Sequence, residues 1–399
     1  MRPRPPKPRW TGLAAASAAV GLLACAGGPG ATEPRRAEQG TPDSAPQAST
    51  RVERQIAAMG TALVVEIEAP SRAEALAASE VAARALEAAE QRLSTWRADS
   101  ELSRLNAADV GSSVALSPEL ATELAVAVHW ARATQGAFDP AVGALVDAWG
   151  LRGAGRIPSA REIEGALVPG GIARALGLEG QQAVRLQPAL RLEEGGFGKG
   201  AGLDAALRAL HGTAARSATL DFGGQIAWYA SEPVAGSASA RDGQALDPWL
   251  EIADPRDRSR SIARVRTARA SAATSANSEH ARTVAGRRIG HILDPRTGEP
   301  AADFGSVTVL ADRAIDADCL STGLFVLGPD RALEFAEQHG GIDVVVAEQL
   351  SSGDLRLRAS AGIAASLEVL VPDVILQSNV HAPSPGSLSH GHPPELKSP

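Results

Sequence analysis

A helix over residues 312–328, DRAIDADCLSTGLFVLG, is the element around which this chain must fold. Its second half, residues 324–327, contains only Leu, Phe and Val, so we expect it to be buried. Gly328 followed by Pro329 ends the helix, because glycine suits the C-terminal cap and proline cannot continue the helix. Other elements of the chain must therefore cover this helix.

The first half of the same helix carries oxygen donors. Residues four apart lie on one face of a helix, so Asp318 lies above Thr322, with Ser321 beside them. A carboxylate and hydroxyls arranged in this way suit a hard cation such as Mg²⁺. The alternative is that Asp316 and Asp318 only favour the helix N-terminus, where the helix dipole stabilises acids.

The charge balance restricts the class of partner. The 399 residues carry a formal net charge of -7, and no basic cluster follows the first ten residues. We therefore expect no nucleic acid as the main partner. Only 3% of the residues are aromatic, so the core must consist mainly of Ala, Val and Leu.

Residues 1–25 are typical of an export signal. Positive side chains come first, on Arg2, Arg4, Lys7 and Arg9. The apolar residues 11–24 follow, which is too short a run to span a bilayer as a stable helix. The signal ends in Leu-Leu-Ala-Cys at residues 22–25, which resembles the bacterial lipoprotein processing box. In such signals the cysteine receives lipid and becomes the new N-terminus.

We therefore expect an exported lipoprotein that is anchored to a membrane through Cys25 and faces the periplasm, and cleavage without lipid is the alternative. Residues 26–51, rich in Gly, Pro, Ala, Ser and Thr, read as a flexible tether, and residues 377–399 as a disordered tail. The folded domain is expected at residues 52–376. The only other cysteine, Cys319, is expected to be structural, with no disulfide available.

Periodicity and capping residues predict mixed strands and helices. Strands are expected at 62–68, 191–194, 218–222, 225–229, 249–253, 262–268, 288–293, 306–310, 342–347 and 354–358. Helices are expected after Ser71, Ser117 and Ser159, at 141–149, up to about residue 210, at 312–328 and at 330–338. Residues 231–246 read as a polar insertion.

Two local details complete this prediction. The helix after Ser71 is expected to bury Leu76, Val81, Leu86 and Ala89. Asp139 is expected to cap the helix at 141–149.

A glycine-rich turn covers Gly195–Gly200, GGFGKG, just before a helix. Such turns let the backbone approach a phosphate, although they are also common packing devices. The turn is not a Walker A loop, because neither Ser nor Thr follows Lys199, and the spacing of a dinucleotide fingerprint is absent.

Six segments in this order resemble the ApbE family of FAD:protein FMN transferases, the periplasmic flavinyltransferases. They are MGT at 59–61, QRLSTWRADSELSRLN at 91–106, GAFDPAVGALVDAWGL at 136–151, GGFGKGAGLD at 195–204, ATSANSEHARTVAGRRIGHILDPRTGEP at 273–300 and SVTVLADRAIDADCLSTGLFVLGP at 306–329.

The resemblance implies an α+β fold of the family's own T-fold-like type, a single catalytic domain with mixed antiparallel sheets and packed helices. It implies FAD contacts at Met59, Trp96, Ala137, Phe138, Asp139, Glu193, Lys199 and Ile292. It implies Mg²⁺, or alternatively Mn²⁺, held by Gly196 through its backbone and by Asp318, Ser321 and Thr322.

The family's chemistry moves FMN from FAD to a Thr or Ser hydroxyl of an acceptor protein, with release of AMP. Acceptors of this kind are redox-pump subunits or periplasmic flavin-carrying domains. The catalytic residues implied are Asp318, through the metal, and His291, which matches the histidine of an HxxDPxTG motif and would take the hydroxyl proton. The alternatives are an FAD pyrophosphatase, which uses water instead, and a lipoprotein that binds FAD without turnover.

The sequence departs from the family's pattern in three places. Glu193 stands where the family usually has Asp, and Ser321 stands where some members have Asp. The family's SGxY is replaced by Ser275, Ala276, Asn277 and Ser278. We expect a longer reach at the first position and a metal site with one fewer charge at the second.

Overall fold

The structure is a computed structural model of the chain, and it describes residues 49–59, 61–231, 248–278, 282–284 and 286–377. The predicted signal peptide with Cys25 lies outside the described residues. The same holds for nearly all of the tether, the polar insertion and the C-terminal tail. Among the described residues, no helix is both long and apolar enough to cross a membrane.

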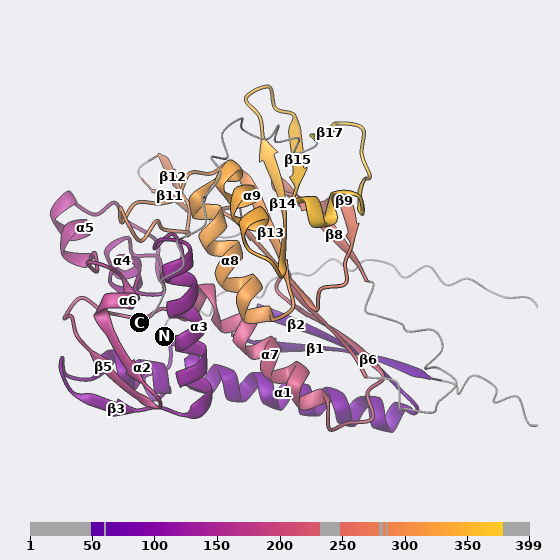
Figure 1. The fold of residues 1–399 in the computed structure, drawn as a ribbon, viewed down its shortest axis with the longest axis horizontal. Coiled ribbons are helices and arrows are strands. Elements are labelled where there is room, and N and C mark those ends of the chain that lie inside the picture. Colours follow the sequence, from indigo (N-terminus) through magenta and orange to yellow (C-terminus); the bar gives the residue numbers. More distant parts are fainter. Residues whose placement is uncertain (1–48, 60, 232–247, 279–281, 285, 378–399) are drawn as a thin grey trace, which may run out of the picture. The chain divides into compact units, whose positions relative to one another are not determined.

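The main element is a nine-stranded sheet (Figure 1). Its strands, in spatial order, are β1 (Thr50–Ala58), β2 (Thr61–Ala69), β6 (Ser217–Phe222), β7 (Gln225–Ala230), β10 (Ser271–Ala276), β13 (Gly305–Ala311), β14 (Ile342–Gln349), β15 (Leu355–Ala359) and β17 (Val374–Leu376). Neighbouring strands are antiparallel except for the parallel pair β15 and β17.

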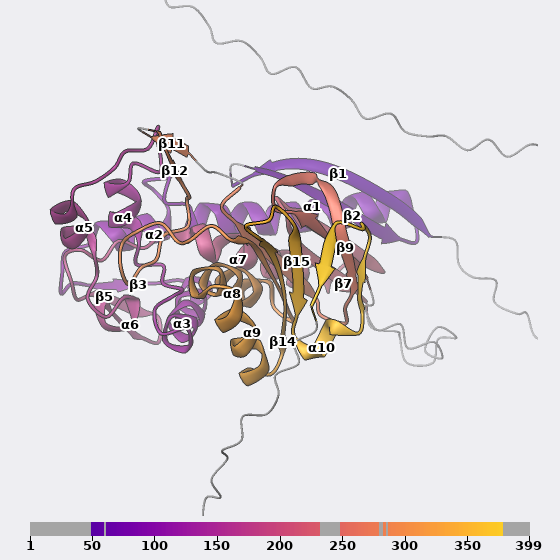
Figure 2. The same cartoon turned by 90° about the horizontal axis from the view of Figure 1, so that it is seen from above.

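Helices cover one face of this sheet and a second sheet covers the other (Figure 2). The covering helices are α1 (Arg72–Leu93), α7 (Gly198–Leu210), α8 (Ala314–Leu327) and α9 (Pro329–Gln338). The second sheet consists of β16 (Leu367–Val369), β9 (Asp257–Arg266) and β8 (Trp249–Asp254), and α10 (Ala361–Ala364) lies between β15 and β16 in the chain. This arrangement confirms the predicted α+β class with mixed sheets and packed helices.

The segment between α1 and α7 forms a lobe with its own apolar clusters. Its helices are α2 (Glu101–Ala107), α3 (Pro118–Ala133), α4 (Gly143–Ala148), α5 (Ala160–Ala166) and α6 (Ile172–Ala175). Its small sheet has the order β3 (Ser113–Ala115), β5 (Gln182–Arg185) and β4 (Leu176–Glu179). A two-stranded ribbon, β11 (Arg282–Val284) and β12 (Arg287–Ile289), packs on α4 and α5 through Val284 and Ile289.

Helix α8 is buried along most of its length; of the half predicted to be buried, Leu324 and Phe325 are buried, whereas Val326 and Leu327 are only partly buried. It contacts β10 and β13 on one side and α7 on another, and two glycines allow α7 and Phe138 of the lobe to approach it closely. A Cβ added to Gly200 of α7 would lie 2.6 Å from the Cα of Ile315 and against the Ala314 carbonyl. A Cβ added to Gly323 would lie 2.6 Å from the Cβ of Phe138. The lobe and α7 therefore touch α8 at positions where a larger residue would push them away.

Most predicted helices and strands are confirmed, but the buried face of α1 differs from the prediction. Leu86 and Ala89 are buried, whereas Leu76 and Val81 are partly exposed. The buried face instead runs through small residues, among them Ala75, Ala78 and Ala82. Helix α7 packs closely on α1, and Gly202 of α7 allows this contact, because an added Cβ there would lie 2.9 Å from the Leu86 side chain.

Three strand predictions also need correction. Residues 191–193 form no strand, and a 3₁₀ turn at Glu194–Gly196 leads directly into α7. The strand predicted at 288–293 ends at Ile289. Strand β1 was not predicted, and it begins within the predicted tether. Only Val52 of β1 is buried, because β1 is an edge strand and its alternation of polar and apolar residues is weak.

Asp139 does not cap α4, whose N-cap is Val142 without a side-chain hydrogen bond. Its buried carboxylate accepts hydrogen bonds from the backbone N–H of Ala141, at 2.8 Å, and from that of Ile172, at 3.0 Å, at the start of α6. The carboxylate lies against the Cα of Gly171, where any side chain would collide with it. Asp139 therefore ties the segment before α4 to the start of α6.

Burial raises the pKa of Asp139 to about 6, although the two backbone hydrogen bonds oppose the shift. The folded protein therefore binds a proton between about pH 4 and 6 that the unfolded chain does not, and the free energy of unfolding falls as pH rises through 6. Relative to Asp139→Asn, the wild-type protein should gain about 2 kcal/mol of stability between pH 7.5 and pH 4.5. Urea unfolding of both proteins at the two pH values measures this difference, and parallel pH dependences would contradict it.

Candidate active site

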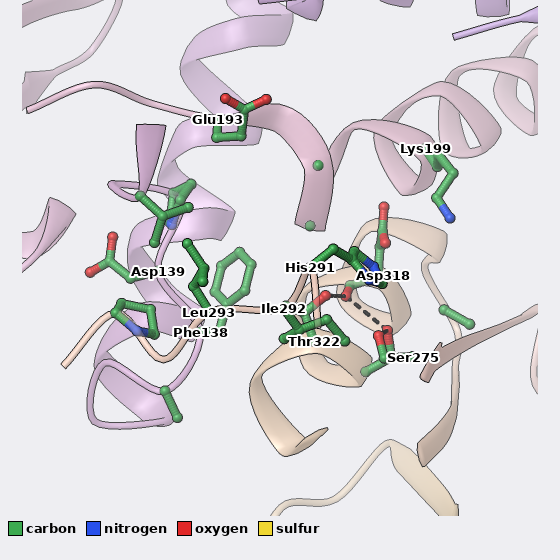
Figure 3. A pocket seen from close by; sticks show the side chains of 18 of the residues that line it. Phe138, Asp139, Glu193, Lys199, Ser275, His291, Ile292, Leu293, Asp318 and Thr322 are labelled. Atoms are coloured by element: carbon green, nitrogen blue, oxygen red, sulfur yellow. Dashed lines mark hydrogen bonds between the residues drawn. The ribbon is translucent and has the colours of Figure 1, made fainter. Parts of the chain in front are cut away.

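One cavity brings together most of the residues that the sequence singled out (Figure 3). It opens between α8, the glycine-rich segment before α7, strand β10 and the loops on either side of the ribbon and α4. The predicted residues that line it are Ala137, Phe138, Asp139, Glu193, Gly196, Lys199, His291, Ile292, Asp318, Ser321 and Thr322. Met59 and Trp96 do not line this cavity.

Asp318 is the buried acid that α8 contributes to the cavity. Its carboxylate accepts a hydrogen bond of 2.9 Å from the backbone N–H of Gly200, in the first turn of α7. Burial raises the pKa of Asp318, and the positive charge of Lys199 and the backbone N–H groups of Lys199 and Gly200 act in the opposite direction. Figure 3 shows Lys199 extending from α7 toward this carboxylate. The carboxylate is therefore held by a helix N-terminus and faced by an ammonium group.

Hydroxyl groups surround Asp318 on α8. Ser321 and Thr322 donate hydrogen bonds to the Asp318 carbonyl, at 3.1 and 3.3 Å. Ser275 of β10, which the sequence did not single out as a site residue, donates to the Ser321 hydroxyl at 3.0 Å. Ser275 directly follows the Ala-Thr pair that begins one of the family-like segments, and this position could have marked it as a site residue.

The predicted metal ligands have the chemistry that Mg²⁺ requires. A Cβ added to Gly196 would lie 3.3 Å from the Thr322 hydroxyl and 3.2 Å from the Phe138 ring, so the backbone of the glycine-rich turn reaches this end of α8. The donors there are one carboxylate, hydroxyls and backbone carbonyls, all hard oxygens. Among the described residues, no group of three or more His, Cys, Asp or Glu side chains is placed to hold a metal. The set thus fits an ion that also uses water and phosphate oxygens as ligands.

A second hollow lies on the other side of the 3₁₀ turn that precedes α7. It is lined by Met59, Glu90, Ser94, Trp96 and Glu194. Trp96 is 67% exposed, and Met59 has a positive φ of 43°. Glu193 lines the main cavity and its neighbour Glu194 lines this hollow, so the two adjoin at the start of the 3₁₀ turn.

The Glu193 side chain does not extend freely into the cavity. It accepts a hydrogen bond of 2.6 Å from the Arg152 guanidinium and another of 3.0 Å from the Thr95 hydroxyl. Neither partner could be predicted from the sequence, since they lie 41 and 98 residues from Glu193 in the chain. The longer reach expected of a glutamate is therefore directed toward Arg152.

His291 lies in the loop that follows β12. The buried Asn277 holds this loop, because its side-chain oxygen accepts from the Ile292 N–H at 3.4 Å and its amide donates to the Ala301 carbonyl at 3.3 Å. The Asn277 amide packs directly on Gly290, where a Cβ would lie 2.5 Å from its nitrogen. Asn277 was noted only as a departure from a motif, and the structure gives it a role in placing this loop.

Relatives of this chain are found by sequence. The sequence model of the ApbE family matches residues 59–346. The FAD:protein FMN transferase of Treponema pallidum is 32% identical over 316 residues, which are 76% of this chain and 85% of that protein. The FAD:protein FMN transferase of Vibrio cholerae is 31% identical over 286 residues, 70% of this chain and 82% of that protein.

Solved structures agree with the sequence matches. The flavin transferase ApbE from Vibrio cholerae aligns with a TM-score of 0.65 at 28% identity and covers 79% of this chain and 98% of its own. The ApbE protein from Thermotoga maritima aligns with a TM-score of 0.65 at 27% identity, over 77% of this chain and 96% of its own. The matched region contains both the cavity and the second hollow, and this chain belongs to the ApbE family.

Proposed function

We propose that this protein transfers FMN from FAD to a Thr or Ser hydroxyl of an acceptor protein and releases AMP. The observation that carries the proposal is the cavity in which Asp318, Lys199 and His291 lie beside the apolar Phe138 and Ile292. Its curated relatives from Treponema pallidum and Vibrio cholerae are named for this reaction. The acceptor is a protein of the kind the family modifies, a redox-pump subunit or a periplasmic flavin-carrying domain.

The proposed reaction is a displacement at phosphorus. The acceptor oxygen forms a bond to the phosphorus of the FMN half, the bridging P–O bond breaks, and AMP leaves with its electron pair. His291 takes the proton that the hydroxyl loses, since an imidazole can act as a base near neutral pH. Positioning and charge neutralisation supply most of the rate in such transfers.

Groups on α8 and at the start of α7 would neutralise the negative charge of the diphosphate. Asp318, Thr322 and the Gly196 carbonyl, with Ser321 beside them, would hold Mg²⁺, or alternatively Mn²⁺, which would neutralise the diphosphate and stabilise the departing AMP. Lys199 adds a second positive charge to the same part of the cavity. The N-terminus of α7 adds partial positive charge from its backbone N–H groups.

The two hollows suit a ligand with two ring systems joined by a diphosphate. Phe138 and Ile292 offer apolar contacts in the main cavity, and Met59 and Trp96 offer them in the second hollow. Gly195 and Gly196 of the glycine-rich segment line the main cavity, and Glu194 just before them lines the second hollow. FAD would thus cross this segment with its diphosphate close to Lys199.

Replacing Asp318 with Asn should reduce transfer by about 10³-fold, because the site loses the one carboxylate that would hold the metal. The assay contains the purified domain, FAD, Mg²⁺ and a candidate flavin-carrying domain, and it records acceptor mass and AMP release together. A mass gain of one FMN, matched by AMP and abolished by a chelator, is the expected wild-type result. Asp312→Asn, an exposed acid just before α8, is the matched control and should behave as wild type.

Three other outcomes contradict this proposal. AMP and free FMN without a gain of acceptor mass would indicate an FAD pyrophosphatase. Tight FAD binding with no AMP would indicate a protein that binds FAD without turnover. Full activity of Asp318→Asn would remove Asp318 from the metal site.

Replacing His291 with Ala should reduce transfer by about 10²- to 10⁴-fold, the usual contribution of a general base. The affinity for FAD should stay within about twofold, because a base for the acceptor proton is not needed to bind the nucleotide. Isothermal titration with FAD and the transfer assay separate the two effects. His129→Ala, on the exposed side of α3, controls for the loss of an imidazole, and normal transfer by His291→Ala would refute the assignment.

The protein is proposed to be exported and anchored by lipid on Cys25, facing the periplasm. Support comes from the charged first residues, the apolar run at 11–24 and the Leu-Leu-Ala-Cys box. Acyl chains on the mature N-terminus would hold the protein at a membrane. In a bacterial host, Cys25→Ser should move the protein from the membrane fraction to the soluble fraction and remove the acyl mass from its N-terminal peptide. A wild-type protein without acyl mass would contradict the anchor.

A further inference from the structure

Arg152 contacts both Glu193, which lines the main cavity, and Trp96, which lines the second hollow. One of its terminal nitrogens donates to the Thr95 hydroxyl and to the Glu193 carboxylate, both at 2.6 Å, and the other donates to the Thr95 carbonyl at 3.2 Å. The same guanidinium lies over the ring of Trp96, with its central carbon 4.8 Å from the ring centre. One side chain thus contacts three residues from two separate segments.

The loop that carries Arg152 is itself well fixed. It follows α4, where the buried Trp149 donates a hydrogen bond of 2.7 Å to the Gly298 carbonyl. The loop closes through a hydrogen bond from Gly155 N–H to the Gly150 carbonyl, and Arg282 of the ribbon donates to the Gly153 carbonyl at 3.0 Å. The Arg152 side chain therefore extends from a backbone segment that is held in place by hydrogen bonds.

The position of the Trp96 ring depends on its contact with Arg152. Trp96 is 67% exposed, and few packing contacts would hold so exposed a ring in one orientation. The guanidinium covers one face of the ring, as in a cation–π contact. A ring held in this way loses less conformational freedom when a flat ligand stacks on it.

The guanidinium also balances charge at the 3₁₀ turn. Glu193 and Glu194 are adjacent, and Thr95 donates to Glu193 through its hydroxyl and to Glu194 through its backbone N–H. Arg152 forms an ion pair of 2.6 Å with Glu193 and thereby offsets negative charge beside a cavity proposed to take an anionic diphosphate.

We propose that Arg152 is a positioning residue for FAD binding. Its guanidinium holds Trp96 and Glu193 in the arrangement that receives the nucleotide. This inference rests on the proposed function, because it takes FAD as the ligand. It explains how a glutamate serves where the family usually has an aspartate: the longer side chain is drawn back onto a guanidinium. Nothing in the residue pattern of the family segments identifies Arg152.

The test measures FAD affinity and turnover separately for Arg152→Gln and Arg152→Lys. Arg152→Gln should raise the dissociation constant and the KM for FAD by about tenfold, the scale of one lost stacking contact, while kcat at saturating FAD changes little. Arg152→Lys keeps the charge but lacks the planar fork, so it should fall between wild type and Arg152→Gln. Arg156→Gln, which removes an arginine of the same loop that pairs with Glu162, is the matched control and should match wild type.

A double-mutant cycle with Glu193→Gln measures how the two substitutions are coupled in their effect on FAD affinity, which a purely structural role would not predict. In the Arg152→Gln background, Glu193→Gln should restore part of the lost FAD affinity, because it removes a negative charge beside the diphosphate that Arg152 no longer offsets. Unchanged FAD affinity in Arg152→Gln, or additive effects in the cycle, would overturn the inference. Should Arg152→Gln fail to fold, an FAD affinity of Arg152→Lys equal to wild type would overturn it as well. Failure of the wild-type protein to bind FAD would instead refute the proposed function.

Discussion

The site depends on the hydrogen bond between the Asp318 carboxylate and the first turn of α7. A carboxylate buried in the core is costly unless dipoles or charges compensate it, and the N-terminus of a helix provides such dipoles. This contact requires α7 and α8 to approach closely, which Gly200 allows because a Cβ there would lie 2.6 Å from the Cα of Ile315. The same approach brings Lys199 toward Asp318 and Gly196 next to Thr322. One interaction between two helices therefore assembles the polar end of the cavity.

The opposite walls of the site are held by contacts between distant segments. Asn277 fixes the loop that carries His291 by bonding to its backbone, and Gly290 leaves room for the amide. Arg152 fixes Trp96 and Glu193 across the 3₁₀ turn. Neither contact belongs to a helix or a strand, so the regular elements place the backbone and these side chains place the loops. The proposed ligand would meet loops whose positions are set before it arrives.

The sequence predicted the elements whose signals are local. Serine caps located α1, α3 and α5, the apolar run that ends at Gly328 and Pro329 located α8, and the collinear motif segments located most of the cavity. Prediction from the sequence failed where packing between elements distant in the chain decides which side chains are buried or bonded. Leu76 and Val81 looked buried by type, but both are exposed, and the face of α1 that packs against the sheet and α7 carries the small residues and Leu86 instead. Asp139 looked like a local cap, yet its strongest role joins two segments 33 residues apart. Arg152 was missed for the same reason, since its partners are distant in the chain.

The two departures from the family's pattern affect the electrostatics of the site in different ways. At Glu193 the extra length is absorbed by the ion pair with Arg152, so the negative charge remains but is compensated. At Ser321 a charge is absent, and the hydroxyl is held by Ser275 and by the Asp318 carbonyl. A cation bound there would keep more of its positive charge, because one carboxylate offsets less of it than two. Such a site binds the bare ion more weakly and attracts a diphosphate more strongly, so the nucleotide's own phosphates would supply much of what holds the ion.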